Sequence, residues 1–268
     1  MTSQSEGLSE RLKKLYIDDK TLINDSKISE KNLTIALHKL KIYVSNKIKK
    51  TFSNGILEII SSITLFDLKM YQYNKNNNFP FPIKSDKNKS IKPDGGIWFL
   101  IINNTKYLLM IVEDKKQGTN DIRFENKLKK QSTGNAIERF AKNVRACEML
   151  SCNINIFPYV IFASGCDFHE TETISDRLVI GNYGFPNHYI SINNKTNNIN
   201  ILCNIISILK KVNIYKINHK CIASIFIKTH KWDEMKHNSS DWNISEIYDI
   251  LKCIIDKSIN YYKIELNI

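Results

Sequence analysis

Two apolar runs separated by an Asn-Asn pair constrain the fold of this chain more than any other feature. Residues 97–102 read Ile-Trp-Phe-Leu-Ile-Ile, and residues 106–112 are again mostly aliphatic and aromatic. Both runs have the length of a buried β-strand and the residue types that strands favour. Because asparagine tolerates positive φ angles, the pattern predicts a β-hairpin with Asn103 and Asn104 as its two turn residues.

The predicted hairpin brings acidic residues together at its open end. Counting outward from the turn residues, cross-strand pairing places Asp94 opposite Glu113. Because side chains alternate along a strand, we expect Ile111, Glu113 and Lys115 on one face of the second strand. Two carboxylates and an ammonium group would therefore converge at this end of the hairpin.

These residue types suit the hydrolysis of a phosphodiester. Asp94 and Glu113 offer the hard oxygen ligands that Mg²⁺ prefers, and the backbone carbonyl of Asp114 is placed to join them. A bound metal ion acts as a Lewis acid and lowers the pKa of its water. Lys115 could orient or deprotonate the attacking water, or stabilise the developing charge, and the sequence leaves these roles open. The alternative interpretation is an ordinary surface hairpin with a Glu–Lys pair.

The charge balance favours a polyanionic partner. Lys and Arg number 39 against 27 Asp and Glu, which gives a net charge of +12. Such a surplus favours nucleic acid or an anionic membrane surface, although basic proteins without either partner also exist. No apolar run reaches the length of a membrane span, so we expect no membrane association.

The cysteines and the first ten residues indicate in which cellular compartment the protein is expected. The six cysteines show no zinc-binding spacing with the histidines, and we interpret them as buried thiols in a reducing cytoplasm. Met1 to Glu10 is polar and lacks the apolar core of a signal peptide. Both observations predict a cytoplasmic protein.

The order of the predicted elements indicates an α/β fold with a central mixed β-sheet flanked by helices. Residues 1–30 are polar, and we expect an arm that is mobile or partly helical, followed by a single catalytic and DNA-recognition domain over residues 31–268. The segment 56–70 fits either a helix or strands. A helix is predicted to start near Ser29, with an apolar stripe at Leu33, Leu37, Leu40 and Val44. The remaining predictions are helices over 135–150 and 244–262 and a strand over 156–162.

Several segments resemble, in order, the EcoRI-type restriction endonucleases of the PD-(D/E)xK nuclease superfamily. Ser90 to Ile97 is similar to the active-site strand of that family, and residues 113–118 (Glu-Asp-Lys-Lys-Gln-Gly) match its Glu-Ala-Lys-His-Gln-Gly. Residues 134–139 (Gly-Asn-Ala-Ile-Glu-Arg), with Lys142 and Asn143, are similar to its recognition segment. Residues 157–160 and 182–186 continue the match, which covers roughly residues 85–190.

The resemblance implies a homodimer that needs Mg²⁺ and cuts palindromic double-stranded DNA. It assigns Asp94, Glu113 and Lys115 as the catalytic set, and it places the segment from Gly134 to Arg139 in the major groove. On a helix, the polar residues of this segment would share the face opposite its apolar stripe. Asn pairs bidentately with adenine, a carboxylate accepts from an exocyclic amine, and Arg donates to purine N7. The predicted recognition residues are Gln131, Ser132, Gly134, Asn135, Ala136, Glu138, Arg139, Lys142 and Arg177.

Two departures from the family concern base recognition. The chain has Gln131-Ser132-Thr133 where the family has Met-Ala-Ala, at positions that contact pyrimidines in EcoRI. Ile174 replaces the first arginine of an Arg-x-x-Arg pair, whereas Arg177 matches the second. The inference of an inner AATT therefore has more support than the full site.

The combined expectation is a type II restriction endonuclease that cuts both strands of a GAATTC-like site and leaves 5′ overhangs. Such an enzyme implies a functional pairing with an adenine-specific DNA methyltransferase that protects host sites. Two alternatives share the same residues: a repair or junction-resolving nuclease that selects DNA by structure, and a catalytically silent DNA-binding protein.

Overall fold

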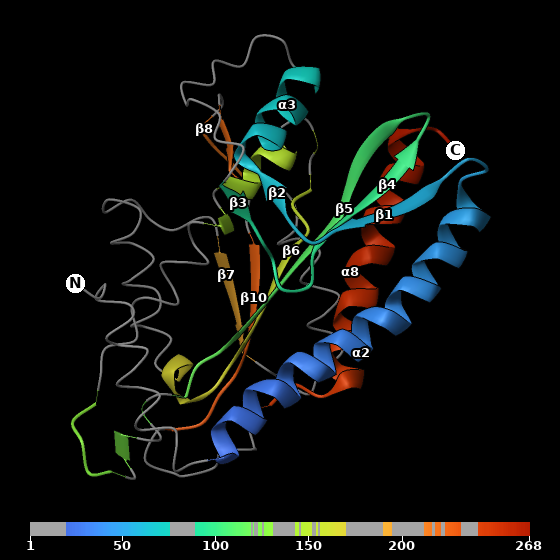
Figure 1. The fold of residues 1–268 in the computed structure, drawn as a ribbon. Coiled ribbons are helices and arrows are strands. Elements are labelled where there is room, and N and C mark those ends of the chain that lie inside the picture. The colour runs from blue at the N-terminus through green and yellow to red at the C-terminus, as the bar shows by residue number, and fades with distance from the viewer. Residues whose placement is uncertain are drawn as a thin grey trace.

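The fold is given by a computed structural model, shown in Figure 1. It describes residues 20–75, 89–118, 120, 123–124, 126–130, 143–144, 146–151, 154, 156–169, 190–194, 212–215, 218–220, 223–231 and 241–268.

A six-stranded mixed sheet forms the centre of the molecule, in the order β1-β4-β5-β6-β10-β7. The pairs β1–β4 and β4–β5 are antiparallel, whereas β5, β6, β10 and β7 pair in parallel. The strands are β1 (Ile56–Ile60), β4 (Ile97–Ile102), β5 (Thr105–Lys116), β6 (Tyr159–Ser164), β7 (Ile190–Asn194) and β10 (Ala223–Lys228). Two small antiparallel pairs accompany it: β2 (Ile63–Thr64) with β3 (Ser90–Ile91), and β8 (Val212–Tyr215) with β9 (Asn218–Lys220). The predicted α/β fold with a mixed central sheet is confirmed.

Helices cover both faces of the sheet. The long helices α2 (Lys20–Thr51) and α8 (Ile244–Glu265) lie side by side across one face (Figure 1). Between these helices and the sheet lies the α2/α8 core, whose buried residues include Leu40, Trp98 and Leu251. Helix α3 (Leu65–Lys75) and the short helix η1 (Glu148–Ser151) contact each other and belong to a second core. This α3 core includes Leu68, Ile111 and Tyr159.

The two long helices match the sequence predictions closely. In α2, Leu33, Leu40 and Val44 are buried and Leu37 packs against the α2/α8 core, which confirms the predicted stripe. The helix begins at Lys20, earlier than its predicted start, and residues 1–19 of the expected arm lie outside the described residues. Helix α8 begins with a capping box, in which the Asn243 side chain accepts from the amide of Glu246.

The structure defines the type or the bounds of three other predicted elements. The undecided segment 56–70 forms strands β1 and β2 followed by the start of α3, so it contains both kinds of element. The strand predicted over 156–162 is present as β6, shifted to Tyr159–Ser164. Of the helix predicted over 135–150, residues 143–144 and 146–147 are helical and η1 follows.

A β-bulge interrupts the predicted hairpin. Asn103 and Asn104 have φ angles of 49° and 61°, which confirms the tight turn with two positive φ angles. Phe99 pairs with Leu108, but Trp98 pairs with Met110, so Leu109 is the extra residue of β5. Both Leu109 and Met110 face the α2/α8 core. The bulge therefore reverses which side chains of β5 point to which face of the sheet.

Side chains from the α2/α8 face hold the bulged hairpin. The Tyr262 hydroxyl donates to the carbonyl of Leu108 at 2.9 Å, directly beside the bulge. The Trp98 indole donates to the carbonyl of Gly95 at 2.9 Å. Both aromatic side chains are almost fully buried, so these hydrogen bonds form where water does not compete. The Tyr262 bond links β5 to α8, and the Trp98 bond links β4 to the segment that precedes it.

The helices also share one polar cluster, which we call the Asp256 cluster. The Asp256 carboxylate accepts from the Tyr43 hydroxyl at 2.8 Å and from the Lys47 ammonium at 2.7 Å. Lys252 lies 3.4 Å from the same carboxylate. The cluster joins α2 to α8 near the surface, where the Asp256 side chain is 22% exposed.

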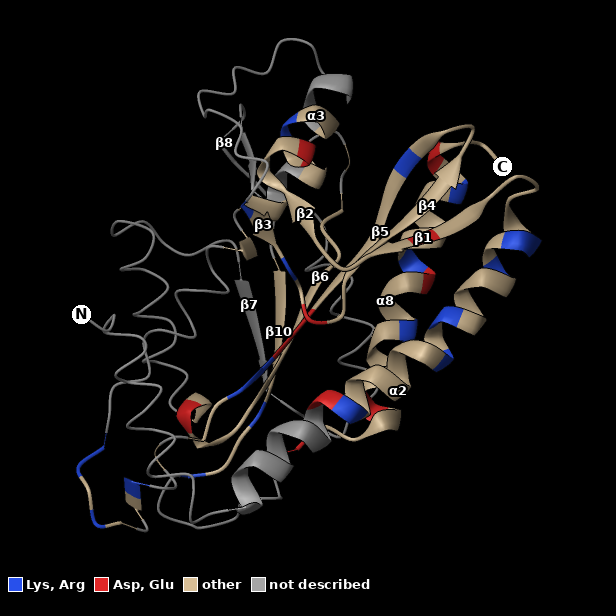
Figure 2. Ribbon diagram, viewed as in Figure 1, with Lys and Arg blue, Asp and Glu red and all other residues tan. Residues whose placement is uncertain are grey.

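Charge is distributed unevenly over these elements. Lys, Asp and Glu residues occur along α2 and α8, whereas β4 carries no charged residue (Figure 2). On β5 the charges are concentrated at the end that pairs with β6, from Glu113 to Lys116. Among the described helices, none is long and apolar enough to cross a membrane.

Candidate active site

Backbone hydrogen bonds continue the β4–β5 ladder beyond the end of β4 and place Asp94 beside β5. The amide of Gly95 donates to the carbonyl of Val112 at 2.9 Å, and the amide of Val112 donates to the carbonyl of Gly96 at 3.2 Å. Gly96 has a φ of 78°, and a Cβ atom there would lie 2.9 Å from the carbonyl oxygen of Ile60. The glycine pair therefore permits the close approach that the short loop before β4 requires.

The predicted pairing of Asp94 with Glu113 is wrong by one residue. The Asp94 carboxylate accepts from the backbone amide of Asp114 at 3.1 Å, so Asp94 lies beside Asp114. The cause is the bulge, because one extra residue in β5 shifts every later pair of the hairpin. The same shift turns Ile111 into the α3 core and places Glu113 and Lys115 on that face, as the alternation along β5 predicts.

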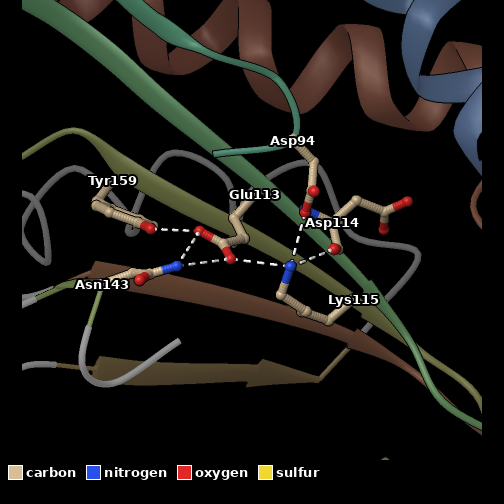
Figure 3. Close-up of polar contacts among 6 residues, drawn as sticks. All are labelled: Asp94, Glu113, Asp114, Lys115, Asn143 and Tyr159. Carbon is tan, nitrogen blue, oxygen red and sulfur yellow. Dashed lines mark hydrogen bonds and ion pairs between the residues drawn. The ribbon is translucent and has the colours of Figure 1, made fainter. Parts of the chain in front are cut away.

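Three oxygen atoms converge on the Lys115 ammonium group, as Figure 3 shows. Its Nζ atom lies 2.7 Å from Asp94 Oδ2 and 2.9 Å from Glu113 Oε1. It also donates to the backbone carbonyl of Asp114 at 3.1 Å. The predicted convergence of two carboxylates and an ammonium group is therefore present in the structure, together with the carbonyl.

Glu113 is the buried member of this group, with a side chain only 1% exposed. The Tyr159 hydroxyl donates to its Oε2 atom at 2.5 Å, and the Asn143 amide donates to its Oε1 atom at 3.2 Å. Tyr159 can reach Glu113 because it pairs with Ile111 in the parallel β5–β6 ladder, two residues before Glu113 on the same face. Hydrogen bonds of this kind offset the desolvation of a buried carboxylate.

The electrostatics of the site keep its proton donors protonated. Burial lowers the pKa of Lys115, but the charge of Glu113 and the hydrogen bond to Asp94 outweigh burial and raise it overall. Burial and the Glu113 charge raise the pKa of Tyr159 well above its usual value, and they also raise the pKa of the buried Cys147 thiol. Lys115 is thus an ammonium group, Tyr159 a phenol and Cys147 a neutral thiol at neutral pH.

The oxygen atoms around Lys115 also fit a divalent metal ion. Asp94, Glu113 and the Asp114 carbonyl provide hard oxygen donors, and all three already surround one cationic atom. The Asp94 side chain is 43% exposed, so the site is open to solvent on that side. Within the described part of the chain, no group of three or more His, Cys, Asp or Glu side chains is placed to hold a metal ion. The donors at Lys115 are two carboxylates and one backbone carbonyl.

The predicted recognition residues, at positions 131–142 and 177, lie outside the described residues. The structure instead reveals two contacts of the Glu113 carboxylate that the predicted site residues did not include, Asn143 and Tyr159. Both occur in segments that resemble the family, so sequence likeness marked them without assigning a role. Tyr159 meets Glu113 through the parallel register of β5 and β6, which the periodicity of a single strand does not reveal.

Comparisons with known proteins identify the family of the chain. A family model described as "Restriction endonuclease EcoRI" matches residues 18–268. The type II restriction enzyme EcoRI of Escherichia coli is 33% identical over 141 residues, which cover 41% of this chain and 50% of that protein. The type II restriction enzyme RsrI of Cereibacter sphaeroides is 34% identical over 88 residues, covering 30% of this chain and 32% of RsrI.

The aligned parts thus span half of the length of one curated relative and about a third of the other. The family model, in contrast, extends over nearly the whole chain and includes every residue of the site around Lys115. This chain belongs to the EcoRI family of restriction endonucleases.

Proposed function

We propose that this protein is a type II restriction endonuclease that hydrolyses both strands of double-stranded DNA with the help of Mg²⁺. The observation that carries the proposal is the convergence of Asp94, Glu113 and Lys115 at the end of β5, in a chain of the EcoRI family. The two relatives are both named type II restriction enzymes, and the net charge of +12 suits a polyanionic substrate.

In the proposed mechanism, Asp94, Glu113 and the Asp114 carbonyl would hold the metal ion. When bound, Mg²⁺ supplies Lewis acidity and a water of lowered pKa. Tyr159 and Asn143 fix the orientation of the Glu113 carboxylate, so that it does not have to be ordered in each turnover. The raised pKa of Lys115 favours the roles of an ammonium group, which are to orient the attacking water and to stabilise charge on the phosphoryl oxygens.

Sequence selection is proposed for the segment that precedes Asn143. Asn135, Glu138 and Arg139 would recognise an inner AATT, and Gln131 and Ser132 would face the outer base pair of a GAATTC-like palindrome. Each well-formed bidentate pair discriminates by about 1–3 kcal/mol. Gly134, Ala136, Lys142 and Arg177 complete the proposed recognition set.

A homodimer fits this proposal, because two-fold symmetry matches a palindromic site. Each protomer would cut one strand, and we expect 5′ overhangs. Residues 31–268 would act as one catalytic and recognition domain, with residues 1–30 as an arm. The protein would act in the cytoplasm beside an adenine-specific methyltransferase that protects host DNA.

Digestion of a sequenced plasmid tests the proposal. With Mg²⁺ we expect a few discrete fragments, whose sequenced ends share one palindrome and carry 5′ overhangs. Prior adenine methylation of that palindrome should block cleavage. Cleavage of branched DNA in preference to duplex DNA would overturn the proposal in favour of a structure-selective nuclease. Specific binding of the palindrome without cleavage in Mg²⁺ would contradict catalysis.

A further inference from the structure

The Lys115 ammonium group occupies the point on which the metal ligands converge. Its Nζ atom contacts the same three oxygens that would hold a metal ion, at 2.7 Å, 2.9 Å and 3.1 Å. The geometry points to Lys115 as a built-in cation that fills this place and must leave it before a divalent metal ion can bind. The inference deepens the proposed function and rests on its assignment of these oxygens as metal ligands.

Coulomb repulsion makes the two cations mutually exclusive at this point. An ammonium nitrogen and a divalent ion that share the same oxygens would be separated by only a few ångströms. The Lys115 side chain is 25% exposed and Glu113 is almost fully buried, so water screens such repulsion incompletely. The Asp94 side chain is 43% exposed and marks the open side of the site, whereas the Tyr159 hydroxyl and the Asn143 amide bind Glu113 on the other side. A displaced lysine side chain would therefore move toward Asp94 and solvent.

The charge balance of the cluster gives the direction of the effect. Asp94 and Glu113 carry two negative charges, and Lys115 neutralises one of them. A metal ion that binds the wild-type protein must therefore displace an ion pair. Replacement of Lys115 by a neutral side chain removes the competitor and leaves both carboxylates for the metal. Metal affinity without DNA should consequently rise when the catalytic lysine is removed.

The test measures Mn²⁺ binding to the full chain in the absence of DNA, by electron paramagnetic resonance of free Mn²⁺. We expect Lys115→Met to bind Mn²⁺ at least about tenfold more tightly than the wild type, because a like charge near the ion has been removed. Lys50→Met serves as the matched control, since it removes the same charge from an exposed position at the end of α2. This control should bind Mn²⁺ as the wild type does.

Two further arms make the result decisive. Asp94→Asn, introduced into Lys115→Met, should abolish the gain in affinity if the ion binds at this site. Lys115→Gln replaces Lys115→Met if the latter does not show cooperative thermal unfolding. Equal Mn²⁺ affinity of the wild type and the neutral variants, or a gain that survives Asp94→Asn, would overturn the inference.

Plasmid cleavage by the same wild-type preparation separates the two proposals. A wild type that cleaves while its lysine variants show no gain in Mn²⁺ affinity refutes the built-in cation and leaves the nuclease assignment standing. A wild type that does not cleave, with variants that gain affinity, refutes the nuclease assignment and supports the competition between Lys115 and the metal ion.

Discussion

Two carboxylates on opposite faces of the sheet contact the same types of side chain, a tyrosine and a lysine. Asp256, on the α2/α8 face, accepts from the Tyr43 hydroxyl and pairs with Lys47. Glu113, on the α3 face, accepts from the Tyr159 hydroxyl and pairs with Lys115. A carboxylate, a phenol and an ammonium group within hydrogen-bonding distance are therefore common to a helix–helix contact and to the candidate active site.

The two clusters differ in two ways: a second carboxylate, Asp94, lies beside Lys115, and Glu113 is buried more deeply than Asp256. Lys115 also contacts the Asp94 carboxylate and the Asp114 carbonyl, whereas Lys47 forms its ion pair with Asp256. Glu113 is 1% exposed and Asp256 is 22% exposed, so their charges are screened very differently. The comparison teaches that the candidate active site is set apart by oxygen atoms that converge on one cation in a poorly screened place. A tyrosine and a lysine beside a carboxylate do not suffice.

Replacement of the lysine in each cluster should give the largest difference in cleavage rate between the two. We expect Lys115→Ala to lower the cleavage rate by about 10³-fold or more, because the ammonium group that orients water and stabilises charge is lost. Specific DNA binding, measured by fluorescence anisotropy, should persist. The matched change Lys47→Ala should leave the cleavage rate within about twofold. Full cleavage by Lys115→Ala would show that the two lysines are equivalent after all.

Removal of the tyrosine hydroxyls should give the next largest difference. Tyr159→Phe removes the shorter of the two hydrogen bonds to Glu113 Oε2, and we expect cleavage to fall by about 10- to 100-fold, with partial recovery at higher Mg²⁺ concentration. Tyr43→Phe should cost only about 0.5–1.5 kcal/mol in the free energy of unfolding. Steady-state cleavage at several Mg²⁺ concentrations makes the distinction. An unchanged Mg²⁺ dependence in Tyr159→Phe would argue that this hydroxyl serves stability alone.

Neutralising Asp256 tests the structural side of the comparison. Asp256→Asn keeps the shape of the side chain but removes its charge, and we expect a loss of about 0.5–2 kcal/mol in stability because the cluster is partly exposed. Urea denaturation measures that loss. Cleavage at a temperature where the variant is folded should match the wild type. A large drop in cleavage would mean that the α2–α8 contact affects the site directly.

The smallest expected effect is on stability at alkaline pH, and it involves a buried tyrosine on each face of the sheet. Burial raises the pKa of both Tyr159 and Tyr262, so each keeps its proton in the folded state above the pKa of about 10 that unfolded tyrosine shows. Above that pH the folded state holds more protons than the unfolded state, and stability falls as pH rises. Tyr159→Phe and Tyr262→Phe should each make this fall less steep in urea titrations between about pH 9 and 11. A fall that neither variant changes would contradict the protonated state of both phenols.

The sequence predicted the hairpin, the α2 stripe and the convergence at the site because these depend on local patterns. Asparagine at two turn positions and alternation along β5 are readable from neighbouring residues. The assignment of a catalytic role to Asp94, Glu113 and Lys115 came from the same spacing together with the family resemblance, and it stays a prediction. The hairpin, the stripe and the convergence of the three side chains are encoded within short segments, and the structure contains them.

The register error and the missed partners have a different physical origin. Nothing in the run from Leu108 to Val112 marks Leu109 as the bulged residue, since all five residues are apolar. The Tyr262 hydrogen bond to Leu108, directly beside the bulge, comes from α8, which lies far away in sequence. Tyr159 likewise meets Glu113 only through the parallel β5–β6 pairing. Long-range packing decides these details, and a single sequence does not display it.

The bulge in β5 has a consequence for how this strand tolerates changes of length. Between the turn and Leu109, the described strand partner of β5 is β4, and an added residue there can be accommodated by the turn or by the bulge itself. From Ile111 to Asp114 the strand is held on both sides, by β6 and by the segment from Asp94 to Ile97, and β6 pairs with it as far as Lys116. One inserted residue between Ile111 and Glu113 would exchange inward and outward positions and turn Glu113 and Lys115 toward α2 and α8. Insertions and deletions among relatives should therefore gather at the hairpin tip, while the last six residues of β5 keep a constant length.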